Sequence, residues 1–170
     1  MKPKAGDYNS YYDRYISLIE DEDILKVLKE QLKSSITFLK SFSEDDGNYA
    51  YADGKWTVKE LLGHVIDTER IMTYRALSFA RNEEQSQPGF EQDDYVSYGN
   101  FNKRTLQDLI EELKLVREAN CILFNSLDEE ALNRKGIASE FEISVLALIF
   151  IIAGHEKHHM KILKERYKRS

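Results

Sequence analysis

The four histidines of the chain fall in two places, His64 alone and His155, His158 and His159 together. Neutral imidazole is the commonest protein ligand for zinc, nickel, copper and iron. His155 and His159 are four residues apart, a spacing that puts two side chains on adjacent turns of one helix face. This pattern predicts a pair of ligands for a divalent metal ion.

The apolar residues around this pair indicate which way it points. On a helical wheel, His158 lies about 60° to one side of His155, towards solvent. We therefore predict His155 and His159 as ligands, and His158 as a surface residue or a neighbour of the ligands. Five apolar residues lie within roughly 80° of His155 on this wheel: Leu148, Ile151, Ile152, Ile162 and Leu163.

His64 lies at the flank of another apolar stripe, about 100° from its centre. A lone histidine in such a place is more commonly a surface or seam residue, but two candidate partners at 155 and 159 make it the predicted third ligand. Glu69 lies in the centre of the same stripe, where an unpaired carboxylate is costly. We expect Glu69 either to support a ligand or to form a buried ion pair.

Residues 155–159 also read His-Glu-x-x-His, the metalloprotease motif in which the glutamate acts as general base. Such proteases take their third ligand downstream, and no histidine follows His159. No strand-rich segment that could hold a peptide precedes the motif, so a protease is disfavoured. Glu156 as a general base stays an alternative, and a solvated charge beside Lys157 is the favoured interpretation. No catalytic residue is assigned.

The elements that must position these residues are helices. Only two prolines and long runs with apolar residues three or four apart predict an all-α four-helix bundle. Thr57 and Glu60 form a capping box at the start of the second helix. The predicted helices run from Asp23 to Phe42, from Thr57 to Asn82, from Thr105 to about Leu127, and from a start between Ser139 and Ser144 to about Tyr167.

The depths of the histidines constrain the helix directions. His64 lies about 10 Å from the start of its helix and His159 about 14 Å from the end of its own, so the two meet only if these helices are antiparallel. A short connection makes the third and fourth helices antiparallel, and the second and third must then be parallel. The segment 83–104 is long enough to be the required crossover, because about twenty extended residues span roughly 65 Å.

Composition excludes several classes of function. A formal net charge of −6 argues against nucleic-acid binding, which depends on clustered Lys and Arg. The apolar run 145–153 is too short to span a bilayer and residues 1–10 lack an apolar core, so we expect one cytoplasmic domain over residues 1–170 with no membrane partner. The single cysteine, Cys121, excludes an intramolecular disulfide and is expected to be a buried helix residue.

Aromatic residues are concentrated near the N-terminus, at Tyr8, Tyr11, Tyr12 and Tyr15. Together with the 83–104 crossover they could form the walls of a substrate site. Packing of these rings against the ends of the bundle is the favoured interpretation.

Two stretches carry a resemblance to a known family. Residues 54–69 read Gly-Lys-Trp-Thr-Val-Lys-Glu-Leu-Leu-Gly-His-Val-Ile-Asp-Thr-Glu, and residues 154–159 read Gly-His-Glu-Lys-His-His. Three further features also match: the pattern Tyr8, Tyr12, Tyr15 and Ile16, the Pro88-Gly89-Phe90 loop, and residues 134–139 before the last helix. The chain resembles the DinB/YfiT-like family over nearly its whole length.

The resemblance implies an up-down-down-up four-helix bundle that holds one divalent ion with His64, His155 and His159. Zinc or nickel is the expected ion, with iron or manganese as alternatives. The implied activity is that of a metal-dependent hydrolase acting on a small molecule. The alternatives are a low-molecular-weight-thiol S-transferase of the bacillithiol type using the same metal, and a non-catalytic metal-binding stress-response module. The resemblance further implies a homodimer.

Overall fold

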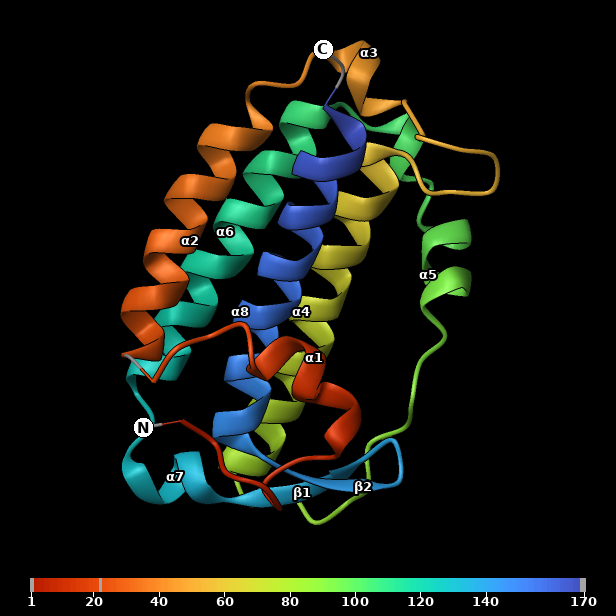
Figure 1. Cartoon of the computed structure of the whole chain (residues 1–170). Coiled ribbons are helices and arrows are strands. Elements are labelled where there is room, and N and C mark those ends of the chain that lie inside the picture. The colour runs from red at the N-terminus through yellow and green to blue at the C-terminus, as the bar shows by residue number, and fades with distance from the viewer. Residues whose placement is uncertain (1, 22, 169–170) are drawn as a thin grey trace.

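Four long helices form the body of the part of the chain that the structure describes, and Figure 1 shows their arrangement. The computed structural model describes residues 2–21 and 23–168. Within them the long helices are α2 (Ile24–Leu39), α4 (Val58–Ala80), α6 (Leu106–Asn125) and α8 (Val145–Ile162), and α8 continues into a π-helical turn, Leu163–Tyr167.

Short elements precede α2 or connect the long helices. They comprise α1 (Asp13–Ile16), α3 (Glu44–Gly47), α5 (Gln92–Gly99), α7 (Glu129–Asn133), the 3-10 turns Ser10–Tyr12 and Phe101–Lys103, and the strands β1 (Lys135–Ala138) and β2 (Phe141–Ser144).

The helices follow an up-down-down-up order (Figure 1). α2 and α8 run in one direction, and α4 and α6 run in the other. The chain between α4 and α6 therefore returns along the whole bundle, and it carries α5 on its way. The predicted all-α bundle with a long crossover between its second and third helices is confirmed.

Side-chain caps set where the long helices begin. The predicted capping box is present at α4, where the Thr57 hydroxyl accepts from the Glu60 amide at 3.1 Å and the Glu60 carboxylate accepts from the Thr57 amide at 2.8 Å. At α6 and α8 the cap is one-way: the Thr105 hydroxyl accepts from the Asp108 amide and the Ser144 hydroxyl accepts from the Ala147 amide, both at 3.1 Å. Two helices end earlier than predicted: α2 ends at Leu39 and not at Phe42, and α4 ends at Ala80 and not at Asn82.

A β-hairpin between α7 and α8 was not predicted. β1 and β2 pair antiparallel, with Lys135 opposite Ser144. Ser139 and Glu140 form the turn with φ values of 51° and 71°, and two residues with positive φ give the turn type whose twist matches a hairpin. Neither is a glycine, so the sequence lacks the usual signal. The crossover joins the hairpin through Gln87, whose amide donates to the Ile137 carbonyl at 2.8 Å.

The core consists of two apolar clusters at different depths along the bundle. One contains the C-terminal half of α4 and the N-terminal half of α8, and the other contains the opposite halves of these helices. Between the clusters lies a buried polar layer: His64, Glu69, Arg117, His155, Glu156 and His159. Among the described residues, no helix combines the length and the apolar character needed to cross a bilayer.

Candidate metal centre

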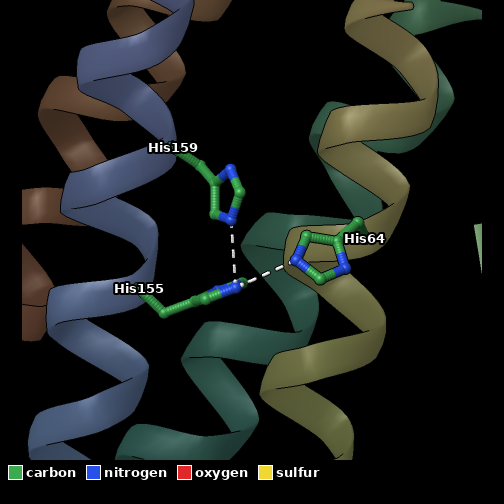
Figure 2. Close-up of side chains that lie close together, drawn as sticks. All are labelled: His64, His155 and His159. Carbon is green, nitrogen blue, oxygen red and sulfur yellow. Dashed lines mark hydrogen bonds between the residues drawn. The ribbon is translucent and has the colours of Figure 1, made fainter. Parts of the chain in front are cut away.

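Three histidine rings meet between α4 and α8 (Figure 2). The Nε2 atom of His155 lies 3.0 Å from Nε2 of His64 and 3.1 Å from Nε2 of His159. All three residues offer a ligand atom within 4.8 Å of one another. The antiparallel arrangement of α4 and α8 thus brings His64 to the depth of the other two, as the depth argument requires.

Local packing holds the rings in place. The Trp56 ring lies 4.8 Å from the His64 ring, and the Tyr15 ring meets the His155 ring edge-on at 5.2 Å. Gly154 permits the second contact, because a Cβ there would lie 2.2 Å from the carbonyl oxygen of Tyr15. The absent side chain lets α1 pack directly on α8 beside His155.

Burial keeps the three imidazoles neutral. Each ring is at most 8% exposed. Desolvation lowers the pKa of His64 to about 4 and that of His159 to about 3, and it holds the pKa of His155 well below its usual range. Near neutral pH each ring therefore keeps a lone pair, which a metal ligand needs.

The donor set fits a divalent ion. A neutral imidazole nitrogen carries either one proton or one lone pair, so Nε2 of His155 cannot make two regular hydrogen bonds to its two neighbours. Ring nitrogens around a tetrahedral zinc ion are about 3.3 Å apart, close to the distances between these Nε2 atoms. An ion between the nitrogens would use all three lone pairs at once.

His158 lies outside this cluster. Its half-buried ring meets the Tyr15 ring at 5.6 Å and the His159 ring at 5.1 Å, both edge-on. The cluster of possible ligands found in the described residues does not include it. His158 is a packing neighbour of the site.

The favoured interpretation of Glu156 as a solvated charge is wrong. Its side chain is 1% exposed, and its Oε2 lies 2.8 Å from Nη2 of Arg117. It also lines a pocket between α2 and α8, away from the His64 side of its helix. The carboxylate is thus held by an arginine in the core, which does not fit the general base of a His-Glu-x-x-His protease.

Glu69 forms the buried ion pair that was one of its two predicted roles. Arg117 donates to both of its carboxylate oxygens at 2.8 Å, and Asn120 donates to Oε1 at 3.0 Å. A further N–H of Arg117 donates to the Leu28 carbonyl at 3.2 Å. Sequence reasoning missed Arg117. The only signal was its place among the apolar residues of its helix, and its partners are far away in the chain.

A pocket of about 450 Å³ opens beside the histidines. His64 and His155 line it directly. Its other walls come from the N-terminal tyrosines, the crossover and the hairpin. Three of the four tyrosines, Tyr11, Tyr12 and Tyr15, therefore line the pocket, although packing against the bundle ends was the favoured interpretation. Tyr8 instead donates to Asp13 at 3.1 Å. The walls include Tyr11, Tyr12, Tyr15, Thr68, Met72, Arg75, Gly89, Phe90, Glu91, Gln92, Asp93, Ser139, Phe141 and Ile151.

Comparison with known families accounts for this arrangement. Residues 28–163 match the sequence profile of the DinB superfamily. The chain belongs to the DinB superfamily. This span contains α2 from Leu28 onward, all of α4, α6 and α8, the crossover and the three clustered histidines. The family resemblance predicted from the sequence is therefore confirmed.

Relatives of this DinB chain are distant in sequence. A protein of Oceanobacillus iheyensis named as a candidate metal-dependent hydrolase is 25% identical over 127 residues, which is 74% of this chain and 73% of that protein.

Two solved structures share the DinB fold. YfiT from Bacillus subtilis, described as a probable metal-dependent hydrolase with an unusual four-helix bundle topology, superposes with a TM-score of 0.72 at 16% identity, over 97% of this chain and 90% of that chain. A mycothiol-dependent maleylpyruvate isomerase superposes with a TM-score of 0.67 at 11% identity, over 85% of this chain and 61% of that chain.

Proposed function

We propose that the chain is a metal-dependent enzyme that hydrolyses a small molecule, with one divalent ion held by His64, His155 and His159. The observation that carries the proposal is the convergence of three buried, neutral imidazoles beside a pocket of about 450 Å³, which His64 and His155 line. The name of the Oceanobacillus iheyensis relative supports the same activity.

The ion, when bound, would supply Lewis-acid chemistry and lower the pKa of a water or a thiol next to it. The protein supplies the surroundings. Burial keeps His64 and His155 neutral, and both side chains face the pocket where a substrate would lie. Aromatic rings line part of the pocket, and a substrate packed against them would displace water there, which strengthens electrostatic interactions.

The donor set favours zinc or nickel as the ion. Imidazole suits late first-row metals, whereas carboxylates and water suit magnesium, calcium and manganese. The cluster found in the described residues contains histidine nitrogens alone. Iron and manganese remain the alternatives.

A thiol S-transferase is the second candidate. The fold match to a mycothiol-dependent isomerase favours it, since a low-molecular-weight thiol could be activated by the same ion in the same pocket. Attack by a thiolate on an electrophilic carbon would replace attack by water on an ester or amide. Both candidates need the three histidines, so activity assays must separate them.

Elemental analysis of untagged protein, purified without chelator, tests the metal site. We expect about one zinc or nickel ion per chain in the wild type and in His158→Ala, and none in His64→Ala or His155→Ala. His158→Ala is the matched control, because it removes an imidazole from the same helix but outside the cluster. Equal metal content in all four proteins would overturn the proposed site.

Activity assays then test the enzyme. Metal-loaded protein should hydrolyse aryl esters faster than the chelated protein and than His64→Ala. Turnover only with a thiol and an alkyl or epoxide electrophile would favour the transferase. If metal is bound but no substrate of either class reacts, the site belongs to a non-catalytic module and the proposed enzyme is wrong.

A further inference from the structure

Among the residues that the structure describes, two arginines are almost completely buried, and they differ in their partners. Arg117 contacts the carboxylates of Glu69 and Glu156. Arg75 is 2% exposed, yet no carboxylate of residues 2–21 and 23–168 forms an ion pair with it. Its Nη2 donates instead to the Pro88 carbonyl at 2.6 Å and to the Ser139 hydroxyl at 3.3 Å.

A buried guanidinium without a counter-charge is unfavourable, because neutral acceptors replace only part of its lost hydration. Burial lowers the pKa of Arg75, and only the phenols of Tyr12 and Tyr95 act against this effect. Besides the Pro88 and Ser139 oxygens, its side chain interacts with the Tyr12 phenol, the Met72 sulfur at 3.7 Å and the Phe90 ring at 5.9 Å, and none of these groups is anionic near neutral pH. The group therefore retains capacity for an anion.

Arg75 faces the same pocket as the histidines. His64, Thr68, Met72 and Arg75 all line it from one face of α4. At 1.5 Å per residue, the backbone positions of His64 and Arg75 are about 16 Å apart along the helix. The Thr68 hydroxyl between them is buried without a hydrogen-bond partner in the described part of the chain. The pocket is thus elongated, with imidazoles at one end and a guanidinium at the other.

We propose that Arg75 is an anion subsite that binds the carboxylate of the molecule on which the histidine site acts. The inference rests on the proposed function and specifies its substrate class, an apolar carboxylic acid. The walls that would hold the apolar part carry five aromatic rings, those of Tyr11, Tyr12, Tyr15, Phe90 and Phe141.

The charges around the pocket favour a single carboxylate over a phosphate. Arg75 is the one cationic side chain among the described residues that line it, and the exposed Glu91 and Asp93 line it as well. One guanidinium balances one negative charge and can bind the two oxygens of a carboxylate together. A doubly charged phosphate would keep an uncompensated charge near Glu91 and Asp93.

Binding of a matched pair of probes tests the subsite. 3-Phenylpropionate and its neutral analogue 3-phenylpropionamide differ in the anionic group alone. By calorimetry, wild-type protein should bind the acid at least about tenfold more tightly than the amide, as expected for charge-assisted hydrogen bonds. Arg75→Gln should abolish this preference. Equal affinities in the wild type, or an unchanged preference in Arg75→Gln, would overturn the proposal.

Two further arms exclude other sources of the preference. Arg70→Gln removes one positive charge from α4 outside the pocket, so it should retain the preference. The measurement is repeated on chelated protein, because carboxylates also bind metal ions. If the acid still binds more tightly than the amide after the metal is removed, its carboxylate binds Arg75. If this difference disappears with the metal, the carboxylate binds the metal ion and the proposal is wrong. The metal content of each variant is measured separately, so a failed metal site does not affect this result.

A measurement on a charge-retaining variant guards against misfolding of Arg75→Gln. In wild-type protein, 3-phenylpropionate should shift one arginine Nε–H resonance that is missing from Arg75→Lys, and the amide should leave it unchanged. Inorganic phosphate is titrated in the same way. Tighter binding of phosphate than of 3-phenylpropionate would overturn the assignment of a carboxylate.

Discussion

Nη2 of Arg117 lies 2.8 Å from Oε2 of Glu156, the residue that directly follows His155 in α8. The same guanidinium binds both carboxylate oxygens of Glu69 on α4. One side chain of α6 therefore joins the two helices that carry the clustered histidines. This ion-pair layer lies at the depth of the histidine cluster and opposes sliding of α4 against α8.

Replacement of Arg117 by methionine should strongly destabilise the protein. It leaves Glu69 and Glu156 buried without a cation, a change that typically costs about 3–5 kcal/mol. Urea unfolding of chelated protein at pH 7 measures the loss. Arg117→Met/Glu69→Leu/Glu156→Leu is the control, and it should recover most of the stability because it removes all three charges of this layer together. A single variant that unfolds like the wild type would show that the layer has no structural role.

Glu156→Gln should retain the metal and most of any hydrolytic activity. Its carboxylate pairs with Arg117, and loss of a true general base would lower the rate by about 10²–10⁴-fold. We expect the rate to fall less than tenfold, measured with a substrate that the metal-loaded wild type hydrolyses. A loss of a hundredfold or more with full metal content would restore the general-base role of Glu156.

Gly154→Ala should displace α1 from α8. The new Cβ would lie 2.2 Å from the Tyr15 carbonyl oxygen, and such overpacking typically costs about 1–3 kcal/mol. Denaturant unfolding measures this cost. Gly89→Ala is the matched control, because the nearest atom to its Cβ is the Ser139 hydroxyl at 3.5 Å, an ordinary contact. If both variants unfold at the same denaturant concentration, the close approach of α1 is not required for stability.

Chelated protein should lose stability as the pH falls below about 6.5. The pKa of His64 is lowered to about 4 and that of His159 to about 3. Between those values and 6.5 the unfolded chain binds protons that the folded chain does not. The free energy of unfolding therefore decreases as the pH is lowered through this range. Each histidine contributes up to about 1.4 kcal/mol per pH unit in this range.

Unfolding curves from pH 7.5 to 4.5 check this slope. His159→Ala should show a slope smaller by up to about 1.4 kcal/mol per pH unit than that of the wild type, since one lowered pKa has been removed. His158→Ala is again the control for an imidazole on the same helix. Identical slopes for the wild type and His159→Ala would contradict the buried, neutral state of His159.

Local patterns in the sequence were enough to predict the helices, the capping box at Thr57 and the meeting of His64 with His155 and His159. These features depend on the helical repeat, on hydrogen bonds between near neighbours and on the depth of a residue within its helix. The crossover also followed, because two parallel helices need a connection as long as the bundle. The inferences about the histidines and the crossover use only the rise per residue of a helix and the span of an extended chain, which are the same in every protein.

The tertiary structure alone decided the partners of the charged side chains. Glu156 and Glu69 find Arg117 on another helix, and Arg75 finds neutral acceptors on the crossover and the hairpin. A helical repeat shows which face a side chain occupies, but not which of the surrounding helices that face meets. The energy of a buried charge depends on that neighbour. The ion-pair layer and the walls of the pocket therefore appear only when the helices are packed together.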